Sequence, residues 1–244
     1  MGVDLAAQDK KTGLAVLRWS VGSVVLEHLQ VEAGNIEIRS AGADAAVTGI
    51  DCPLGWPAAF TDLLLAHRAH AAGPETGRDI EARRILAFRR TDFHVHSETG
   101  RWPLSVSADL IGYPAMRAAG LLAGWTPGGK PLRRSGVNSC VAEVYPAAAL
   151  SRWGLTSRGY KADPDLRRTV IDRLGSLAPW LDLGDGEELC ARSDDAFDAV
   201  VAGVVAGAVQ LGRTRGPAPE DLVLAEEEGW VHLPDKDFLR DPWA

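Results

Sequence analysis

The sequence predicts an α/β fold, and two observations carry this prediction. Three strand-like segments follow one another at the start of the chain, and after them apolar strand patterns alternate with helical ones. A long apolar segment, Ala199–Val209, has the composition of a buried helix. With 244 residues, of which 46% are hydrophobic, the chain can bury one substantial core. We therefore expect one domain spanning residues 1–244.

The first three strands are expected to form an antiparallel meander. Met1–Ala7 and Gly13–Trp19 are separated by a polar segment typical of a hairpin, and Val24–Val31 follows as a third strand. Asp4 lies between apolar residues of the first strand, where aspartate is rare. Taken alone, Asp4 is explained at least as well by a solvent-facing edge position as by chemistry.

A short helix over Ala33–Ala45 precedes the next strand, Ala46–Ile50. Asp51 stands at the carboxyl end of that strand, before the proline and glycine that stop it. In open α/β sheets, ligands bind outside the carboxyl ends of strands. The simpler alternative is an ordinary loop aspartate that begins a turn.

A helix over Pro57–His70 leads into an insertion or lid, which we place at about residues 73–131. This segment is polar and rich in arginine, and it ends with a helix over Pro114–Ala123. Its arginines either form an anion-binding surface or are a solvated charged run. His94 and His96 would share a face if their stretch were a strand, but no third metal ligand has recognisable spacing.

The second half of the chain repeats the pattern of a strand carrying an acid. Glu143 lies within the apolar strand Val141–Tyr145, which a proline stops. The remaining expected elements are a helix at Ala147–Trp153, an amphipathic helix at Asp163–Ala178, a loop at Leu181–Leu189, a strand at Gly229–Pro234 and a polar tail at Asp235–Ala244.

The acidic segment before the apolar helix offers both a cap and two further candidate site residues. Ser193 or Asp194 is a natural N-cap, because its side-chain oxygen can accept from the first unpaired N–H groups. Asp195 and Asp198 lie three residues apart and therefore share one helix face. Asp198 falls among small apolar residues, so its carboxylate needs a basic side chain or a metal ion as partner.

Composition restricts the function classes. The net charge of −7 leaves no global basic field, so any nucleic-acid binding must use a local patch. No export signal is visible, and the longest apolar run is too short to span a membrane. Three scattered cysteines suggest neither a disulfide framework nor a thiolate zinc site, which fits a reducing cytoplasm.

Five acids occur in locally apolar settings far apart in the sequence, and their convergence at one site explains them most simply. They are Asp4, Asp51, Glu143, Asp195 and Asp198. Clustered carboxylates repel one another unless they share a cation. Because all the ligands are oxygens, Mg²⁺ or Mn²⁺ is the expected ion, and it could activate water against a phosphodiester.

Six segments resemble an uncharacterised family described as nucleases with an RNase H-like fold, domain of unknown function 429. They are Gly2–Ala6, Gly49–Pro57, Arg90–Asp92, Pro103–Ser107, Ala142–Pro146 and Ser193–Ala199. The resemblance spans nearly the whole chain. It implies a mixed sheet, with the first three strands antiparallel, flanked by helices. The Asp195 and Asp198 pair is similar to paired acids on the last helix of resolvase-like members of the wider superfamily.

The resemblance implies metal-dependent phosphodiester hydrolysis with a site made from distant residues. Asp4, Asp51 and Asp198 are expected to bind the metal, with Asp195 or Glu143 completing the site. Arg90 and Asp92 match the family's own motif and imply substrate contact. Basic residues near them extend the expected substrate-binding set, which is Arg89, Arg90, Asp92 and Lys130.

Two other function classes stay open at this stage. A phosphotransferase of the sugar-kinase and actin-like superfamily would share this kind of sheet, but the hairpin after Asp4 lacks an adjacent Gly-Thr phosphate loop. A non-catalytic binding or scaffold protein would pair its acids with arginines instead of a metal. The substrate, which is a nucleic acid or another phosphodiester, and the oligomeric state are not given by the sequence.

Overall fold

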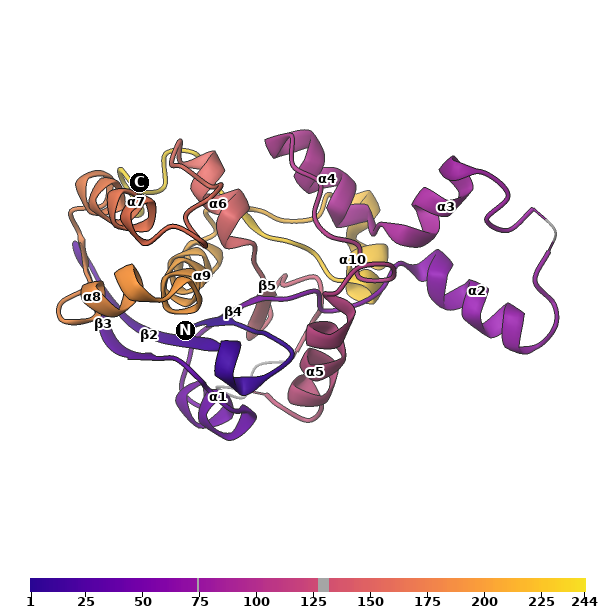
Figure 1. Cartoon of the computed structure of the whole chain (residues 1–244), viewed down its shortest axis with the longest axis horizontal. Coiled ribbons are helices and arrows are strands. Elements are labelled where there is room, and N and C mark those ends of the chain that lie inside the picture. Colours follow the sequence, from indigo (N-terminus) through magenta and orange to yellow (C-terminus); the bar gives the residue numbers. More distant parts are fainter. Residues whose placement is uncertain (74, 127–131) are drawn as a thin grey trace.

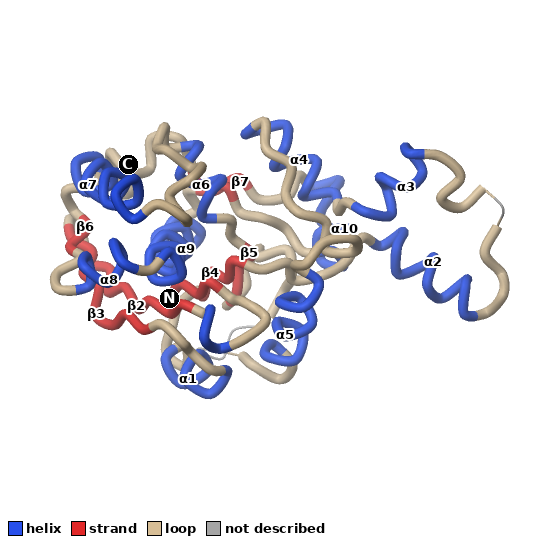
Figure 2. The backbone as a smooth tube through the Cα atoms, viewed as in Figure 1, coloured by secondary structure: helices blue, strands red, loops and turns tan. Residues whose placement is uncertain are grey.

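The computed structural model describes residues 1–73, 75–126 and 132–244. Its main strands are β1 (Gly2–Asp4), β2 (Gly13–Ser20), β3 (Ser23–Gln30), β4 (Thr48–Asp51), β5 (Val141–Glu143) and β6 (Leu181–Asp182). They form one six-stranded sheet in the order β5-β4-β1-β2-β3-β6, drawn in red in Figure 2. A separate two-stranded sheet pairs β7 (Thr214–Arg215) with β8 (Leu233–Pro234).

The sheet is mixed, as predicted. β1, β2 and β3 form the expected antiparallel meander, whereas β4 pairs parallel with β1, and β5 pairs parallel with β4. The register places Asp4 opposite Asp51, and Ile50 opposite Glu143. The carboxyl ends of β1, β4 and β5 therefore meet at one edge of the sheet.

Helices cover both faces of the sheet. They are α1 (Asn35–Ala41), α2 (Ala58–Arg68), α3 (Ile80–Ala87), α4 (Arg90–Thr99), α5 (Gly112–Leu122), α6 (Pro146–Arg152), α7 (Pro164–Leu177), α8 (Gly186–Arg192), α9 (Asp194–Gln210) and α10 (Leu222–Glu228). One apolar core joins α6, α7, α8 and α9 to one face, and another joins α1 and α5 to the opposite face. In Figure 1, α7 and α9 lie above the strands and α1 lies below them. The predicted α/β architecture is confirmed.

The apolar helix predicted near residue 200 is α9, and it packs across β1, β2 and β4. Its start is the predicted cap, because the Ser193 hydroxyl accepts from the backbone N–H of Ala196 at 3.2 Å. Glycines bring the helix unusually close to the sheet. A Cβ atom added to Gly49 would lie 2.6 Å from the Ala202 carbonyl oxygen, so a side chain there would push α9 away.

The stretch with His94 and His96 is the helix α4, where residues two apart do not face each other, so the condition for a shared face is not met. Two sequence-based predictions of local structure are wrong. The loop predicted at Leu181–Leu189 contains β6 and the start of α8. The predicted polar tail is anchored by Phe238 and Leu239, which are buried in the core.

The segment between β4 and β5 holds α2, α3, α4 and α5. Figure 1 shows α2 and α3 projecting away from the sheet and from α9. No residue of α2 or α3 is buried, whereas α4 and α5 each bury part of one face. None of the described helices is both long and apolar enough to cross a membrane.

Candidate active site

Asp4 and Asp51 occupy equivalent positions on adjacent strands. Each is the last residue of its strand, and the parallel pairing of β1 and β4 sets them directly opposite each other. Side chains two residues apart on a strand point to the same face. Gly2 and Gly49, two residues earlier, both face the backbone of α9. Asp4 and Asp51 therefore point toward α9 as well.

Asp198, on α9, supplies a third carboxylate next to the strand ends that carry Asp4 and Asp51. It lies in the second turn of α9 and is fully buried. The hydroxyl of Tyr160 donates to Asp198 Oδ1 at 2.7 Å, and Lys161 Nζ lies 2.5 Å from Asp198 Oδ2. The carboxylate thus has a hydrogen-bond donor at one oxygen and an ammonium at the other.

A cavity of about 570 Å³ opens over these groups. Its described lining includes Asp4, Asp51, Tyr160 and Lys161. The positively charged side chain of Arg101 also lines this cavity. Its guanidinium donates to the Ser157 carbonyl oxygen at 2.8 Å. Acidic groups and cationic groups therefore face one another across a space large enough for a small substrate or a segment of a larger one.

The pKa values of Asp4 and Asp51, which line this cavity, and of Asp198, which is buried on α9, are shifted toward the protonated forms. Burial raises the pKa of Asp4 well above its usual range, and the charges of Asp198 and Asp51 raise it further. The pKa of Asp51 rises to about 7, mainly through burial, although Lys161 opposes the shift. Burial also raises the pKa of Asp198, and Lys161 and Tyr160 oppose that rise. Perturbed acids of this kind mark candidate functional sites.

Glu143 ends the neighbouring strand, but its carboxylate already has strong partners. Arg89 donates to both of its oxygens, with Nη2 2.7 Å from Oε1 and Nη1 2.8 Å from Oε2. The backbone N–H of Leu54 donates to Oε2 at 3.0 Å. Arg89 also donates from Nη2 to Asp92 Oδ1 at 3.0 Å. Arg89, Asp92 and Glu143 thus form a buried network that joins α4 to β5.

The other predicted site residues lie around the cavity or away from it. Asp195 is half-buried, and its charge adds to the rise of the Asp4 pKa, but it does not line the described cavity. Arg90 is exposed and pairs with Asp221 at 2.8 Å. Lys130 lies outside the described residues. The structure therefore gathers Asp4, Asp51, Asp198 and Glu143 and sets Arg90 apart.

A family model described as a protein of unknown function, DUF429, matches residues 2–222. The chain belongs to the DUF429 family. No curated protein and no solved structure gives a significant match. Membership in DUF429 agrees with the six resembling segments, but it carries no activity with it, so the function has to be argued from the site.

Sequence reasoning missed three contributors to the DUF429 site. Tyr160 and Lys161 come from the loop between α6 and α7, and Arg101 comes from the loop after α4. The sequence around Tyr160 shows only a basic residue shortly before a predicted helix, which is a common surface pattern. Their contribution follows from the fold, because α6 packs against α9 and α7 shares the same apolar core, so the loop between α6 and α7 lies at Asp198.

The donor chemistry of the site fits a hard divalent cation. Asp4 and Asp51 accept no side-chain hydrogen bond from any residue in the described ranges, and carboxylate oxygens are preferred ligands of Mg²⁺ and Mn²⁺. Within residues 1–73, 75–126 and 132–244, however, no three His, Cys, Asp or Glu side chains are arranged as a metal centre. The carboxylate of Asp198 is instead engaged by Tyr160 and Lys161.

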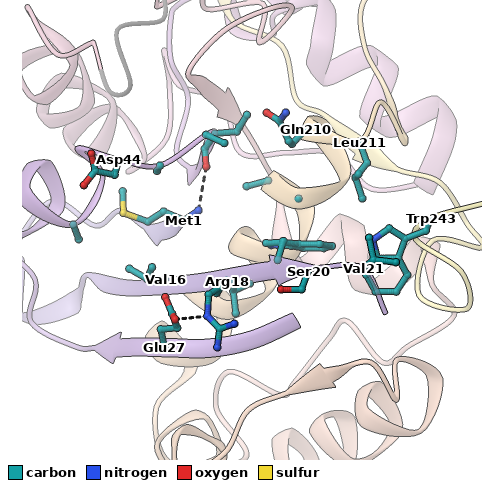
Figure 3. A pocket seen from close by; sticks show the side chains of 18 residues that line it. Met1, Val16, Arg18, Ser20, Val21, Glu27, Asp44, Gln210, Leu211 and Trp243 are labelled. Atoms are coloured by element: carbon teal, nitrogen blue, oxygen red, sulfur yellow. Dashed lines mark hydrogen bonds and ion pairs between the residues drawn. The ribbon is translucent and has the colours of Figure 1, made fainter. Parts of the chain in front are cut away.

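A second cavity, of about 670 Å³, lies at the opposite end of α9 (Figure 3). Its described lining includes Met1, Trp19 and Leu211, with the surface ion pair of Arg18 and Glu27 at its edge. The lining is mostly apolar and contains none of the clustered carboxylates. The candidate site is therefore the cavity that Asp4 and Asp51 line.

Proposed function

We propose that the chain hydrolyses phosphodiester bonds, as a nuclease, with a divalent cation held by Asp4 and Asp51. One observation supports this most strongly. The two carboxylates lie opposite each other in register, face a cavity and accept no side-chain hydrogen bond from the described residues. Burying two such acids side by side is costly without a cation.

The cation would polarise the phosphoryl oxygen and lower the pKa of an attacking water. The chain's own residues would do the rest. Asp4 and Asp51 would hold the cation, and Arg101 and Lys161 would attract the phosphate from the cavity wall. Arg89 holds Glu143 in place, which fixes the end of β5 beside the site.

A local cationic wall is what an acidic protein needs to bind an anionic substrate. The net charge of −7 gives no long-range attraction to nucleic acid. Arg89, Arg101 and Lys161 all line the cavity, so the attraction would act only at short range. We place this activity in the cytoplasm, because Cys52 and Cys190 are present as buried thiols.

The test is hydrolysis of bis(p-nitrophenyl) phosphate and of labelled DNA and RNA oligonucleotides with Mg²⁺, Mn²⁺ or EDTA. Asp4→Asn and Asp51→Asn each remove one cation ligand, so we expect a loss of at least about 100-fold in kcat/KM. Asp44→Asn, on the exposed rim of the second cavity, is the matched control and should retain wild-type activity. Hydrolysis that survives EDTA and both site variants would refute the proposal.

A non-catalytic binding protein is the alternative that a specific observation favours. Asp198 is already paired with Lys161, and Glu143 is already paired with Arg89, so two of the four gathered acids are neutralised by the chain itself. This alternative predicts that Mn²⁺ leaves the melting temperature unchanged. A rise that Asp51→Asn abolishes would exclude it.

A further inference from the structure

The ammonium of Lys161 pairs with the carboxylate of Asp198 and is influenced by the charges of Asp51 and Asp4. Nζ lies 2.5 Å from Asp198 Oδ2, and the side chain lines the same cavity as Asp4 and Asp51. Burial lowers the pKa of Lys161, but the charges of Asp198, Asp51 and Asp4 outweigh it and hold that pKa above its usual value. Lys161 is thus the cation that the acidic cluster uses in this structure.

Lys161 differs from Arg89, which also lines the cavity, in how firmly it is held. Arg89 is 2% exposed and its guanidinium donates to Glu143, to Asp92 and to the Glu228 carbonyl oxygen. The Lys161 side chain is 51% exposed and contacts one carboxylate. The stem of Lys161 can therefore swing into solvent at little cost, whereas Arg89 cannot leave without unpacking its surroundings.

Lys161 pairs with Asp198, and Asp198 is the carboxylate that could complete a cation site with Asp4 and Asp51. Asp4 and Asp51 would supply two ligand side chains from the sheet, and the charge of Asp198, on α9, acts on both of them. Tyr160 fixes only Oδ1 of Asp198, so departure of Lys161 would free Oδ2. A divalent cation and the ammonium would then compete for the same oxygen.

We propose that Lys161 is a built-in countercation, which a divalent cation displaces from Asp198 when it binds to Asp4 and Asp51. This inference rests on the proposed function only for the cation site itself. It assigns Lys161 a regulatory role in metal loading, since the ammonium neutralises the cluster and sets a threshold for metal entry. It also accounts for the observation that, in the part of the chain that the structure describes, these three carboxylates do not form a ready metal centre.

Direct Mn²⁺ titration, by calorimetry and by electron paramagnetic resonance without substrate, tests the competition. Lys161→Met removes the competing charge, so we expect it to bind Mn²⁺ about ten-fold more tightly than wild type, or about 1.4 kcal/mol. Lys161→Arg keeps a cation, and Lys236→Met removes an exposed lysine that does not line the cavity. Both controls should bind Mn²⁺ as wild type does. Unchanged or weaker binding by Lys161→Met would overturn the proposal.

A second measurement uses only the wild-type protein and so does not depend on the folding of a variant. Modification of lysines by an amine-reactive reagent is followed by mass spectrometry with and without Mn²⁺. Displacement should increase the labelling rate of Lys161 several-fold and leave that of Lys236 unchanged. An unchanged Lys161 rate at saturating Mn²⁺ would overturn the proposal. Absence of phosphodiester hydrolysis would instead refute the proposed function, and neither metal measurement depends on that result.

Discussion

At the scale of single residues, the acids at two neighbouring strand ends differ in how their charge is compensated. Glu143 is buried with a bidentate arginine and a backbone donor, so its charge is compensated inside the protein. Asp51, on the next strand, accepts no side-chain hydrogen bond from the described residues, and its pKa rises to about 7. The first arrangement compensates a buried charge within the protein, whereas the second leaves a carboxylate that can take up a proton near neutral pH.

The raised pKa of Asp51 predicts how stability depends on pH in metal-free buffer. Between the ordinary pKa of 3.8 and about 7, the folded protein binds more protons than the unfolded chain. The free energy of unfolding therefore falls as the pH rises through this window, by about 1.4 kcal/mol per pH unit for one group. Urea denaturation at about pH 5 and about pH 7.5 should show this fall.

Asp51→Asn removes the titrating group, so we expect its unfolding free energy to fall less over the same interval. Asp4 has a pKa shifted in the same direction, so some of the fall should remain. Asp44→Asn should keep the wild-type dependence. A slope in Asp51→Asn identical to that of wild type would show that Asp51 ionises normally in the folded protein.

The network around Arg89 predicts a large stability loss on truncation. Arg89→Met leaves Glu143 and Asp92 buried without their guanidinium, and removing one partner of a buried pair costs about 3–5 kcal/mol. Arg90→Met alters an exposed pair with Asp221 and should cost less than about 1 kcal/mol. Urea denaturation of both variants checks this, and equal losses would contradict it.

At the scale of elements, the contact between α9 and the sheet sets the site. α9 lies across β1, β2 and β4. Glycines on these strands let the helix backbone approach so closely that a Cβ atom in their place would clash with it. The close approach brings Asp198 to the ends of β1 and β4, where Asp4 and Asp51 lie. The same small residues that permit tight packing therefore also determine the separation of the carboxylates.

Gly49→Ala should disturb this contact. The new Cβ would lie 2.6 Å from the Ala202 carbonyl oxygen, which is backbone and cannot turn aside, so α9 must shift. We expect a loss of about 1–3 kcal/mol in the free energy of unfolding, measured by urea denaturation. Gly175→Ala on α7 is the matched control, since its Cβ meets no atom within 4 Å and should stabilise the helix. Equal effects would exclude tight packing as the cause.

At the scale of the whole molecule, the chain consists of a well-packed α/β core and a projecting pair of helices. α2 and α3, which project from the rest of the molecule in Figure 1, have no buried residue. They leave several large apolar side chains exposed. These side chains are Leu64, Leu65, Ile80 and Ile85. Helices with so few buried contacts open locally at low free-energy cost.

Limited trypsin digestion should therefore cut this pair of helices first. Arg68 and Arg78 are exposed there, whereas Arg167 in α7 is buried and donates to backbone carbonyls of the core. Mass spectrometry of early products should show cleavage after Arg68 or Arg78 before any cleavage beyond residue 132. An early cut after Arg167 would contradict this division into core and projection.

The sequence by itself determined the α/β class, the strand ends that carry Asp4 and Asp51, and the capped apolar helix with Asp198. These features depend on local periodicity, on turn residues and on acids in apolar surroundings, which are all visible along the chain. The early part of the sheet was predicted well for this reason. The errors at Leu181–Leu189 and at the C-terminal tail arose where short elements gain their order from tertiary packing alone.

Only the tertiary structure decided which partner each acid has. Arg89 pairs with Glu143 across 54 positions of sequence, and the loop with Tyr160 and Lys161 reaches Asp198 from a different element. An ion pair depends on distance and burial, and neither is written in the local pattern around the acid. The candidate carboxylates could therefore be identified from the sequence. Only the fold shows that Lys161 pairs with Asp198 and Arg89 pairs with Glu143, while Asp4 and Asp51 line the cavity.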